Sequence, residues 1–200
     1  CALPILTEGA SSTPYYDEGN YHLGYAYFKR NEPGDLKASN LEFRKYIESL
    51  KQIKLSSLQS NSPLAIKYHD ALLRTADTYL LSKDIKGAAQ FYEKALEMTN
   101  DRVYPLYQLA ICYGVLKNNT KKIELLKQIE TAYPKSEYYL PALIEIAETY
   151  YKGEEQYTNA IAYYKRIEER YPNTESERKS WIQLGNIYYN LKYRKKYFNI

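Results

Sequence analysis

The chain has 200 residues and a formal net charge of +4, from 28 basic and 24 acidic side chains. An excess this small and this dispersed argues against a nucleic-acid-binding protein, which usually carries a basic stripe on one face. Hydrophobic residues make up 44% and charged residues 26%, which is the profile of a soluble folded chain. Tyrosine is unusually frequent, with 25 Tyr against 4 Phe and 1 Trp, so the chain packs with an amphipathic ring whose hydroxyl can stay in water.

Two cysteines, Cys1 and Cys112, are too few and too far apart to indicate a disulfide framework. Cys112 lies in an apolar stretch with helical spacing and is predicted to be a small buried thiol. Cys1 has two interpretations: it is the lipid attachment site of a processed protein, or it marks the boundary of a fragment. The most apolar long stretch, residues 103–116, has 14 residues and is too short to span a bilayer.

The first third of the chain is predicted to contain one irregular hairpin. Residues 1–14 are expected to be a flexible segment, and residues 15–62 a divergent pair of helices. The motif Leu23-Gly24-x2-Tyr27 predicts a first helix over about residues 16–30. After a turn rich in Pro, Gly and Asp, the second helix is predicted over about residues 38–58.

A repeat occupies the rest of the chain. Small residues recur at spacings of 34, 37 and 38 positions: Ala76, Ala110, Ala147 and Gly185. A large apolar residue stands four positions before each: Leu72, Leu106, Leu143 and Trp181. A tyrosine stands three positions after each: Tyr79, Tyr113, Tyr150 and Tyr188. Because these positions fall on one face of a helix, we expect the small residues to mark the close approach of a neighbouring helix and the tyrosines to pack.

Each complete copy is predicted to continue into a second helix after a turn. The motif Ala88-x3-Tyr92-x2-Ala95 recurs as Ala160-x3-Tyr164-x2-Ile167, whereas the middle copy has Lys122 in place of the alanine. Two of these helices end in Tyr-Pro, and proline stops a helix. The predicted copies cover residues 63–102, 103–137 and 138–175, and residues 176–200 are a truncated or terminal copy.

This pattern resembles the tetratricopeptide repeat family, whose units of about 34 residues carry W-x2-LG-x2-Y and A-x3-F marks and a proline. The last copy reads Trp181-x2-Leu184-Gly185-x2-Tyr188. The resemblance covers roughly residues 63–197 and implies an all-α fold, a right-handed α-solenoid of antiparallel helix hairpins. It also implies a concave groove, lined mainly by the first helix of each copy, that binds a protein or peptide partner without a cofactor.

The Tyr-Pro endings, Tyr133-Pro134 and Tyr171-Pro172, and the abundance of tyrosine and lysine are similar to bacterial envelope members of the family, including those of Bacteroidetes. This narrower resemblance implies a periplasmic or outer-membrane location, with Cys1 carrying the lipid. A cytoplasmic location is the alternative.

We expect the groove to be lined by side chains that face away from the small residue of each first helix. These candidates for partner binding are Tyr21, Tyr25, Phe28, Leu73, Asp77, Tyr104, Tyr107, Ile111, Ile144, Glu148, Tyr151, Ile182, Asn186 and Tyr189. Rigid tyrosines lose little entropy on binding and are frequent in protein interfaces. Packing against extra helices or an N-terminal segment is the alternative role for the same side chains.

Two more specific functions are disfavoured by the sequence. A clamp for the carboxylate of a chaperone tail needs cations at inward positions, which here hold Tyr, Leu and Ile, with Asn186 alone of a suitable type. An enzyme is disfavoured because His22 and His69 are 47 residues apart and no metal, phosphate-loop or nucleophile motif occurs. We therefore expect no catalytic site, metal or cofactor, and we place His69 on the surface.

Two functions remain open at this point. The leading interpretation is a scaffold that holds an extended or helical peptide of a partner within a bacterial cell-envelope complex. The alternative is a structural spacer or a self-assembling segment of a longer array, with homo-oligomers formed through an uncapped C-terminal edge. The basic residues Lys192, Arg194, Lys195 and Lys196 are predicted to form an exposed helix surface, with RNA or anionic lipid contact as the weaker alternative.

Overall fold

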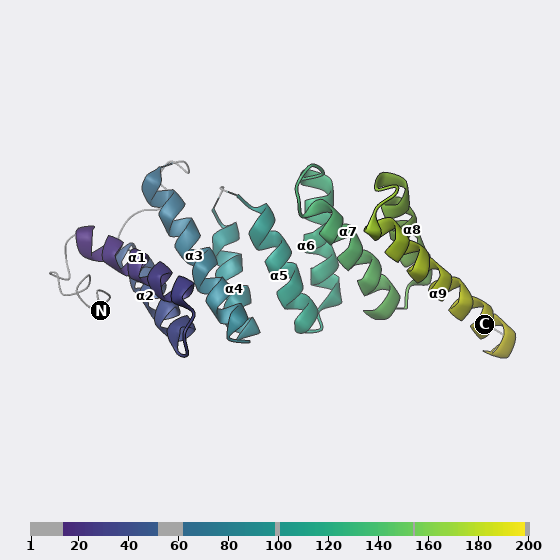
Figure 1. Ribbon diagram of the computed structural model, residues 1–200, viewed down its shortest axis with the longest axis horizontal. Helices are drawn as coiled ribbons and strands as arrows, with labels where there is room; N and C mark the ends of the chain where they lie inside the picture. The colour runs from purple at the N-terminus through teal and green to yellow at the C-terminus, as the bar shows by residue number, and fades with distance from the viewer. Residues whose placement is uncertain (1–13, 52–61, 99–100, 154, 199–200) are drawn as a thin grey trace. The chain divides into compact units, whose positions relative to one another are not determined.

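A computed structural model describes residues 14–51, 62–98, 101–153 and 155–198, and all regular elements within these ranges are helical (Figure 1). This confirms the all-α class. The elements in chain order are α1 (Pro14–Arg30), α2 (Asp35–Ser49), α3 (Pro63–Leu81), α4 (Ile85–Leu96), α5 (Val103–Val115), α6 (Asn119–Ala132), α7 (Tyr139–Glu148), the π-helical turn η3 (Thr149–Gly153), α8 (Tyr157–Arg170) and α9 (Glu175–Phe198).

The chain divides into two compact units, residues 1–116 and 117–200. In the first unit, α1 packs on α2, α2 on α3, α3 on α4 and α4 on α5. In the second unit, α6 packs on α7, α7 on α8 and α8 on α9. Each unit is therefore built from successive helices that cover one another's apolar faces, as a repeat of helical hairpins requires.

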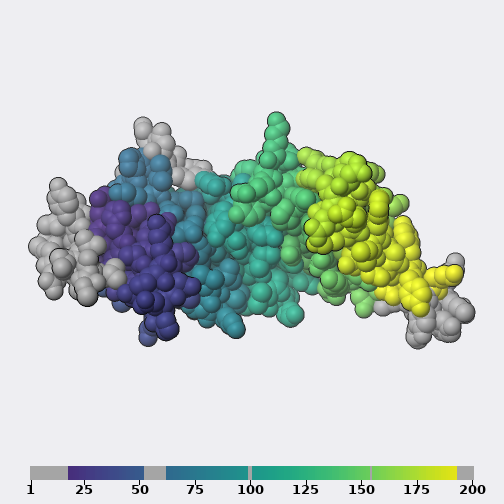
Figure 2. All heavy atoms as spheres, in the orientation of Figure 1, coloured from purple at the N-terminus to yellow at the C-terminus, as the bar shows by residue number. Residues whose placement is uncertain are grey.

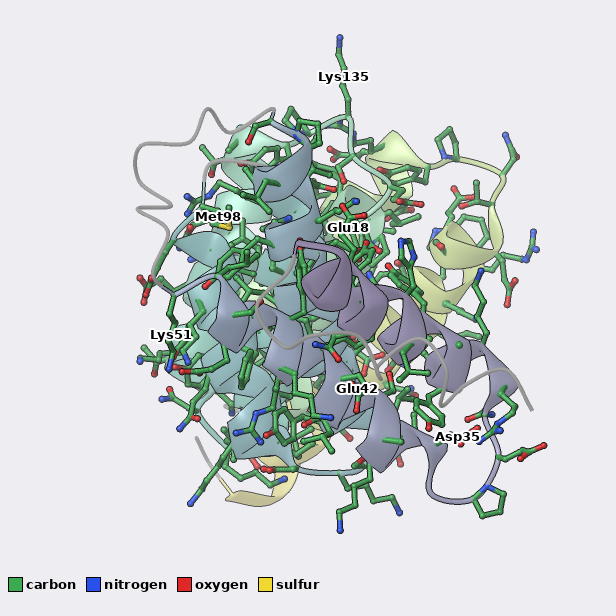
Figure 3. All side chains as sticks on the ribbon, turned by 90° about the vertical axis from the view of Figure 1, so that its left-hand side faces the viewer. Glu18, Asp35, Glu42, Lys51, Met98 and Lys135 are labelled. Carbon is green, nitrogen blue, oxygen red and sulfur yellow. The ribbon has the colours of Figure 1, made fainter. Side chains whose placement is uncertain are left out.

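The first hairpin turns tightly because Gly34 adopts a positive φ of 91°, which L side chains rarely adopt. Asp35, labelled in Figure 3, is the first residue of α2. It accepts two hydrogen bonds from Arg30, at 2.6 and 2.8 Å, and one from the backbone N–H of Glu32 at 2.9 Å. Bonding to the Arg30 guanidinium lowers the pKa of Asp35 to about 2. The ion pair thus ties the end of α1 to the start of α2.

The Leu-Gly motif of α1 marks a close helix contact, as the sequence predicts. A Cβ atom added to Gly24 would lie 2.9 Å from the ring of Phe43 on α2. The hydroxyl of Ser39 donates to the Gly24 carbonyl oxygen at 2.8 Å across the same contact. Phe43 and Tyr46 of α2 are fully buried, so this approach is the centre of the hairpin's core.

The second helix of this hairpin is shorter than the sequence suggests. We expected it over about residues 38–58, but α2 begins at Asp35 and ends at Ser49, with Leu50 as its C-cap. Apolar spacing alone does not show where a helix stops. Residues 52–61, which carry the remainder of that expectation, lie outside the described part of the chain.

The small residues of the next three copies lie where the repeat predicts. Ala76, Ala110 and Ala147 are fully buried, as are the large apolar residues four positions earlier. The prediction is wrong at Gly185, because no heavy atom lies within 4 Å of the Cβ position there apart from α9's own nearby backbone. Trp181 and Tyr188 are also about half exposed, since α8 covers a different face of α9.

Two departures from the repeat have local causes in the second unit. Lys122, which replaces the small residue of α6, extends to Glu145 of α7 and forms an ion pair of 2.6 Å. The third copy contains the π-helical turn η3, and π turns accommodate an extra residue within a helix. Gly153 ends this turn where a Cβ atom would lie 2.7 Å from Nδ2 of Asn119, so the turn lies directly on the start of α6.

Candidate functional site

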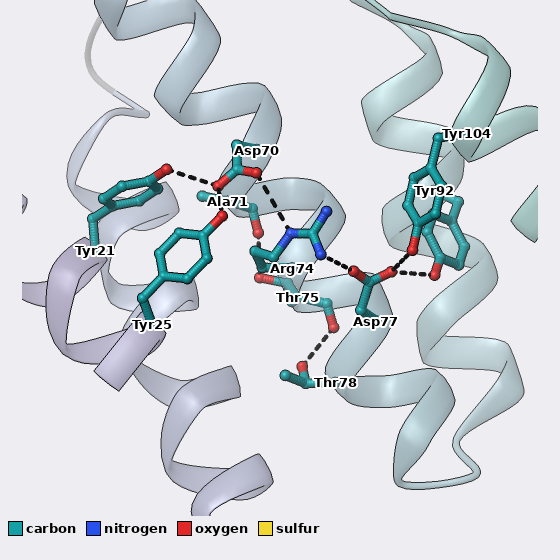
Figure 4. A network of polar contacts seen from close by, with 10 residues as sticks. All are labelled: Tyr21, Tyr25, Asp70, Ala71, Arg74, Thr75, Asp77, Thr78, Tyr92 and Tyr104. Atoms are coloured by element: carbon teal, nitrogen blue, oxygen red, sulfur yellow. Dashed lines mark hydrogen bonds and ion pairs between the residues drawn. The ribbon is translucent and has the colours of Figure 1, made fainter. Parts of the chain in front are cut away.

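Seven polar side chains of the first unit form a connected network across α1, α3, α4 and α5 (Figure 4). We call it the tyrosine–aspartate face, and it consists of Tyr21, Tyr25, Asp70, Arg74, Asp77, Tyr92 and Tyr104. Its three charged residues lie on α3 at positions i, i+4 and i+7, so they project from one side of that helix.

Asp70 joins α3 to α1. Its Oδ2 atom accepts a hydrogen bond from the Tyr21 hydroxyl at 2.7 Å and another from the Tyr25 hydroxyl at 2.5 Å. Partial burial, followed by the bond to the Asp70 carboxylate, raises the pKa of Tyr25 to about 12. Both phenols therefore stay protonated at neutral pH, and both rings are held in fixed positions.

Asp77 joins α3 to α4 and α5. Its Oδ1 atom accepts from the buried Tyr92 of α4 at 2.6 Å and from Tyr104 of α5 at 2.7 Å. Burial and the neighbouring carboxylate raise the pKa of both tyrosines above the ordinary value. Because Asp77 is itself buried, these hydrogen bonds compensate for the loss of water around its charge.

Arg74 lies between the two carboxylates. Its guanidinium is 2.6 Å from Oδ2 of Asp77 and 3.4 Å from Oδ1 of Asp70, and it lies 5.9 Å from the centre of the Tyr104 ring. One cation between two anions leaves the network with a formal charge of −1. The network is thus a rigid arrangement of aromatic rings with a small negative excess.

The structure brings together four of the predicted partner-binding residues, Tyr21, Tyr25, Asp77 and Tyr104. Phe28 of α1, and Tyr107 and Ile111 of α5, are half-buried. Leu73 is buried in the core, because it faces the body of the unit and not the polar side of α3.

Sequence reasoning missed Asp70, Arg74 and Tyr92. It also left out the cation of Arg74, which lies beside the predicted Asp77 and is already paired with two carboxylates. Charges at i, i+4 and i+7 on α3 were the available signal, since such spacing places alternating charges on one helix face. Tyr92 was assigned only to the packing pattern of its helix.

The predicted residues of the second unit have different surroundings. Glu148 pairs with Lys152 at 3.1 Å, and Asn190 donates to the Tyr151 hydroxyl at 3.2 Å. Ile144 of α7 is half-buried. The remaining candidates, Ile182, Asn186 and Tyr189, are exposed on α9.

Two of the tyrosines predicted to pack contact a neighbouring aromatic ring. The Tyr79 ring packs at a tilt against Phe91 with centroids 5.6 Å apart, and Tyr150 packs at a tilt against Tyr163 with centroids 5.9 Å apart. Tyr113, in the copy between them, is half-buried and donates to Glu93 at 2.6 Å. The exposed Tyr188 is the exception described above.

His69 is not on the surface, as the sequence suggested, but buried in the first unit. Its neighbours in sequence are polar, yet its own position on α3 faces α4. No group of three or more His, Cys, Asp or Glu side chains in the described ranges is arranged to hold a metal ion. Of the basic C-terminal cluster, only Lys192 has a described side chain, and it is exposed.

One open cavity of about 430 Å³ lies in the second unit between α6 and the η3 turn. It is lined by Thr120, Ile123, Glu124, Lys127, Tyr150 and Gln156. Within the portion of the chain that the structure describes, no helix has the length and apolar character needed to cross a membrane.

Comparison with known proteins identifies the repeat. Two models described as tetratricopeptide repeat match the chain, one over residues 69–102 and the other over residues 106–136 and 142–174. No curated protein matches the chain in sequence.

Solved structures with a similar fold include the nearly identical TPR-like repeats of a "putative kinesin light chain" from Podosopora anserina. That structure has a TM-score of 0.60 and 16% identity, and the match covers 86% of this chain and 84% of the other. A variant of the same protein gives a TM-score of 0.58 with 15% identity, covering 99% of this chain and 84% of the other. At this identity the similarity shows the helical-repeat fold.

Proposed function

We propose that this chain, which contains tetratricopeptide repeats, is a scaffold that binds a peptide segment of a protein partner on the tyrosine–aspartate face. Such repeats are in general protein-interaction modules, and the family resemblance supports the first helices of successive copies as the binding surface. The observation that carries the proposal is the fixation of half-buried Tyr21, Tyr25 and Tyr104 by buried or half-buried carboxylates.

Fixed tyrosine rings favour binding for an entropic reason. A side chain that is already held in one rotamer loses little freedom when a partner packs against it. Each of the three rings is anchored through its hydroxyl and packs on one side against neighbouring side chains, so the part of the ring that stays exposed is held in place for a partner. This is the behaviour of a preorganised interface.

The charge of the face indicates the kind of segment it would bind. Asp70 and Asp77 with Arg74 leave one uncompensated negative charge, and the Asp70 side chain is partly exposed. We infer that the partner segment is apolar or aromatic with one or more basic residues, and that an acidic segment is disfavoured.

A selection experiment tests the proposal with the complete chain. Random 12-residue peptides displayed on phage are selected against it, and a recovered peptide is synthesised and titrated by fluorescence anisotropy. Asp70→Asn keeps the shape of the side chain and removes its charge, and it should weaken binding of a basic peptide by about three- to tenfold. Glu169→Gln, at an exposed position of α8, makes the same charge change and should leave binding unaltered.

Ring removal provides the second arm of this experiment. Tyr25→Ala and Tyr104→Ala should each abolish most of the binding, with circular dichroism verifying that the variants remain helical. If no peptide is recovered, the result would contradict the scaffold function. The same holds if Asp70→Asn, Tyr25→Ala and Tyr104→Ala all bind the peptide with the affinity of the wild type.

We also propose, from the narrower resemblance, that the chain acts in a bacterial cell envelope with Cys1 as its lipid attachment site. Support comes from the two Tyr-Pro endings and the abundance of tyrosine. Cys1 itself lies outside the described residues. Intact-mass spectrometry of the protein from its native membrane fraction should show an acylated Cys1, whereas a free thiol would rule out the anchor.

A further inference from the structure

Two arginines of α8 converge on one phenol in the second unit. Arg166 and Arg170, which are one helical turn apart, donate to the hydroxyl oxygen of Tyr139 at 3.2 and 3.1 Å. The Tyr139 side chain is buried, and the guanidinium carbon of Arg170 lies 4.3 Å from the centre of its ring. Arg170 also donates to the Pro134 carbonyl oxygen at 3.1 Å. Arg170 is therefore held in a fixed position by neutral groups alone.

The arginine pair is only half neutralised. In the described part of the chain its one carboxylate partner is Glu130 of α6, which pairs with Arg166 and accepts from the Tyr163 hydroxyl at 2.9 Å. Arg170 forms no ion pair with any described residue, and it is exposed. The bonds to Tyr139 and Pro134 use only two of its five N–H donors. The pair thus presents one uncompensated positive charge to solvent.

The other carboxylates near the end of α8 leave this charge uncompensated. Glu168 accepts from Nε1 of Trp181 on α9 at 2.8 Å. Glu169 is exposed and forms no ion pair with a residue that the structure describes. Neither of them occupies the remaining donors of Arg170.

A row of contacts leads from the arginine pair to the open cavity beside α6. Tyr163, the second partner of Glu130, packs at a tilt against Tyr150 with ring centroids 5.9 Å apart. Tyr150 and Ile123 are buried at the floor of this cavity of about 430 Å³, and Lys127 at its rim lies 5.8 Å from the centre of the Tyr150 ring. The second unit is the part of the surface coloured from green to yellow in Figure 2. The cavity and the arginine pair thus belong to one surface, where α8 meets α6.

This surface is distinct from the predicted groove of the same unit. The groove candidates on α7 and η3 are Ile144, Glu148 and Tyr151, and none of them lines the cavity. Glu148 pairs with Lys152 and with neither arginine. The arginine pair and the cavity therefore form a second surface, which the proposed function does not use.

The charge and shape of this surface indicate the kind of ligand that fits it. Lys127 and Glu124 line the cavity, so with Glu130 and the two arginines there are three cations and two carboxylates, a formal charge of +1. A guanidinium binds a carboxylate through two parallel hydrogen bonds, and one that is already held in place loses little freedom on binding. The apolar floor of the cavity suits an apolar side chain.

We propose that this surface binds an acidic segment of a protein partner. A carboxylate of the segment binds Arg170 and Arg166, and an apolar side chain near it enters the cavity. Ile123 and Glu130 are seven residues apart, so about two turns of α6, or about 10 Å, separate the cavity from the arginine pair. An extended segment covers this distance with about three or four residues, so its acidic and apolar residues should be that far apart.

A selection with the complete chain tests the proposal. Twelve-residue peptides displayed on phage carry one fixed Glu and are random elsewhere, without Lys or Arg. A recovered peptide is synthesised with an amidated C-terminus, so that all its carboxylates are side chains, and it is titrated by fluorescence anisotropy at low ionic strength. We expect the recovered peptides to carry a large apolar residue three or four positions from the Glu. A selection that recovers no peptide would overturn the proposal.

Substitutions on α8 test which cation carries the binding. Arg170→Gln removes the uncompensated charge and should weaken binding by about three- to tenfold. Arg170→Lys keeps the charge but loses the planar fork, so it should have an intermediate affinity. Lys165→Gln removes one positive charge from an exposed position of the same helix and should leave binding unchanged. Equal weakening by Lys165→Gln and Arg170→Gln would indicate a general effect of net charge and overturn the proposal.

A double-mutant cycle separates direct contact from a loss of structure, because Arg170→Gln also removes the bonds to Tyr139 and Pro134. Replacement of the peptide's Glu by Gln should weaken binding to the wild-type chain. The same replacement should have little further effect with the Arg170→Gln chain, because the contact is already lost. Independent effects of the two changes would show that Arg170 acts only through the fold, and the proposal would be wrong.

This inference does not depend on the tyrosine–aspartate face, which disfavours acidic segments. Tyr25→Ala should bind the acidic peptide with wild-type affinity, and Arg170→Gln should bind a basic peptide selected on the other face with wild-type affinity. If Tyr25→Ala weakened the acidic peptide as much as Arg170→Gln does, the proposed site in the second unit would be ruled out.

Discussion

Tyr92 and Tyr164 stand at equivalent positions of two copies but differ in their polar surroundings. Each follows the small residue of its helix by four positions. The Tyr92 hydroxyl donates to Asp77 at 2.6 Å, whereas the Tyr164 hydroxyl is buried without a hydrogen-bond partner in the structure. The acid equivalent to Asp77 is Glu148, which is one methylene longer and pairs with Lys152 instead. The copies thus share a sequence pattern and differ in whether the buried phenol has a hydrogen-bond partner.

We expect Tyr92→Phe and Tyr164→Phe to have unequal effects on stability. Tyr92→Phe removes a hydrogen bond to a buried carboxylate and should lower the free energy of unfolding by about 1.5–3 kcal/mol. Tyr164→Phe removes a hydroxyl that has lost its water without gaining a partner, and it should be neutral or stabilising. Urea denaturation followed by circular dichroism measures both. Equal destabilisation would mean that Tyr164 has a partner inside the folded chain.

The buried alanines provide a test of the close helix contacts. Ala110→Leu and Ala147→Leu each add three carbon atoms where the side chain is fully buried, and each should cost on the order of 1–3 kcal/mol of stability through overpacking. Gly185→Leu, at the equivalent but open position, is the matched control and should cost nothing. Thermal melts of the three variants compare them directly. An unchanged midpoint for Ala110→Leu and Ala147→Leu would show that these contacts are loose.

The helical repeat could be predicted from sequence because its signals are local. The spacing of Ala76, Ala110 and Ala147 reflects a contact that each copy makes in the same way, so periodicity alone identifies it. The same spacing failed at Gly185, since a sequence motif does not record whether a neighbouring helix is present. Local pattern therefore predicts what a helix is able to contact, and the tertiary structure decides whether it does.

The tyrosine–aspartate face was only partly predictable for a related reason. Tyr21, Tyr25 and Tyr104 were found because they share a position in their helices. Asp70 and Arg74 resemble ordinary surface charges until α1 and α5 are placed on either side of α3. Long-range hydrogen bonds between residues 45 and 49 positions apart leave no periodic trace in a single sequence.

We expect His69 to make stability depend on pH in the mildly acidic range. Burial lowers its pKa below 6.5, while the nearby carboxylates Asp70 and Asp101 and the Ala95 carbonyl oppose the shift. Because the unfolded chain binds a proton at this histidine more readily than the folded one, the contribution of His69 to stability is constant well above pH 6.5 and falls as the pH drops through and below it. The fall, at most about 1.4 kcal/mol per pH unit, ends once the pH is below the folded-state pKa.

Unfolding free energies of wild type and His69→Gln between pH 8 and pH 5 measure this dependence. The wild type should lose stability in this window, and the variant should show a smaller slope because it lacks the titrating group. Identical slopes for the two proteins would show that His69 does not contribute.

Cys112 should report the opening of α5 through its reactivity. Its thiol is fully buried, and burial raises its pKa to about 11. Relative to the ordinary value of 9.0, this reduces the fraction of thiolate at neutral pH by about a hundredfold, and the thiolate is the reacting species.

In a Cys1→Ser background, Ellman's reagent should therefore react very slowly with Cys112 of the native protein and at once in concentrated urea. Because the thiol becomes accessible only when α5 separates from its neighbours, Ala110→Leu should accelerate the native reaction in proportion to the stability it loses. Rapid reaction of the native wild type would show instead that α5 is not a stable part of the first unit.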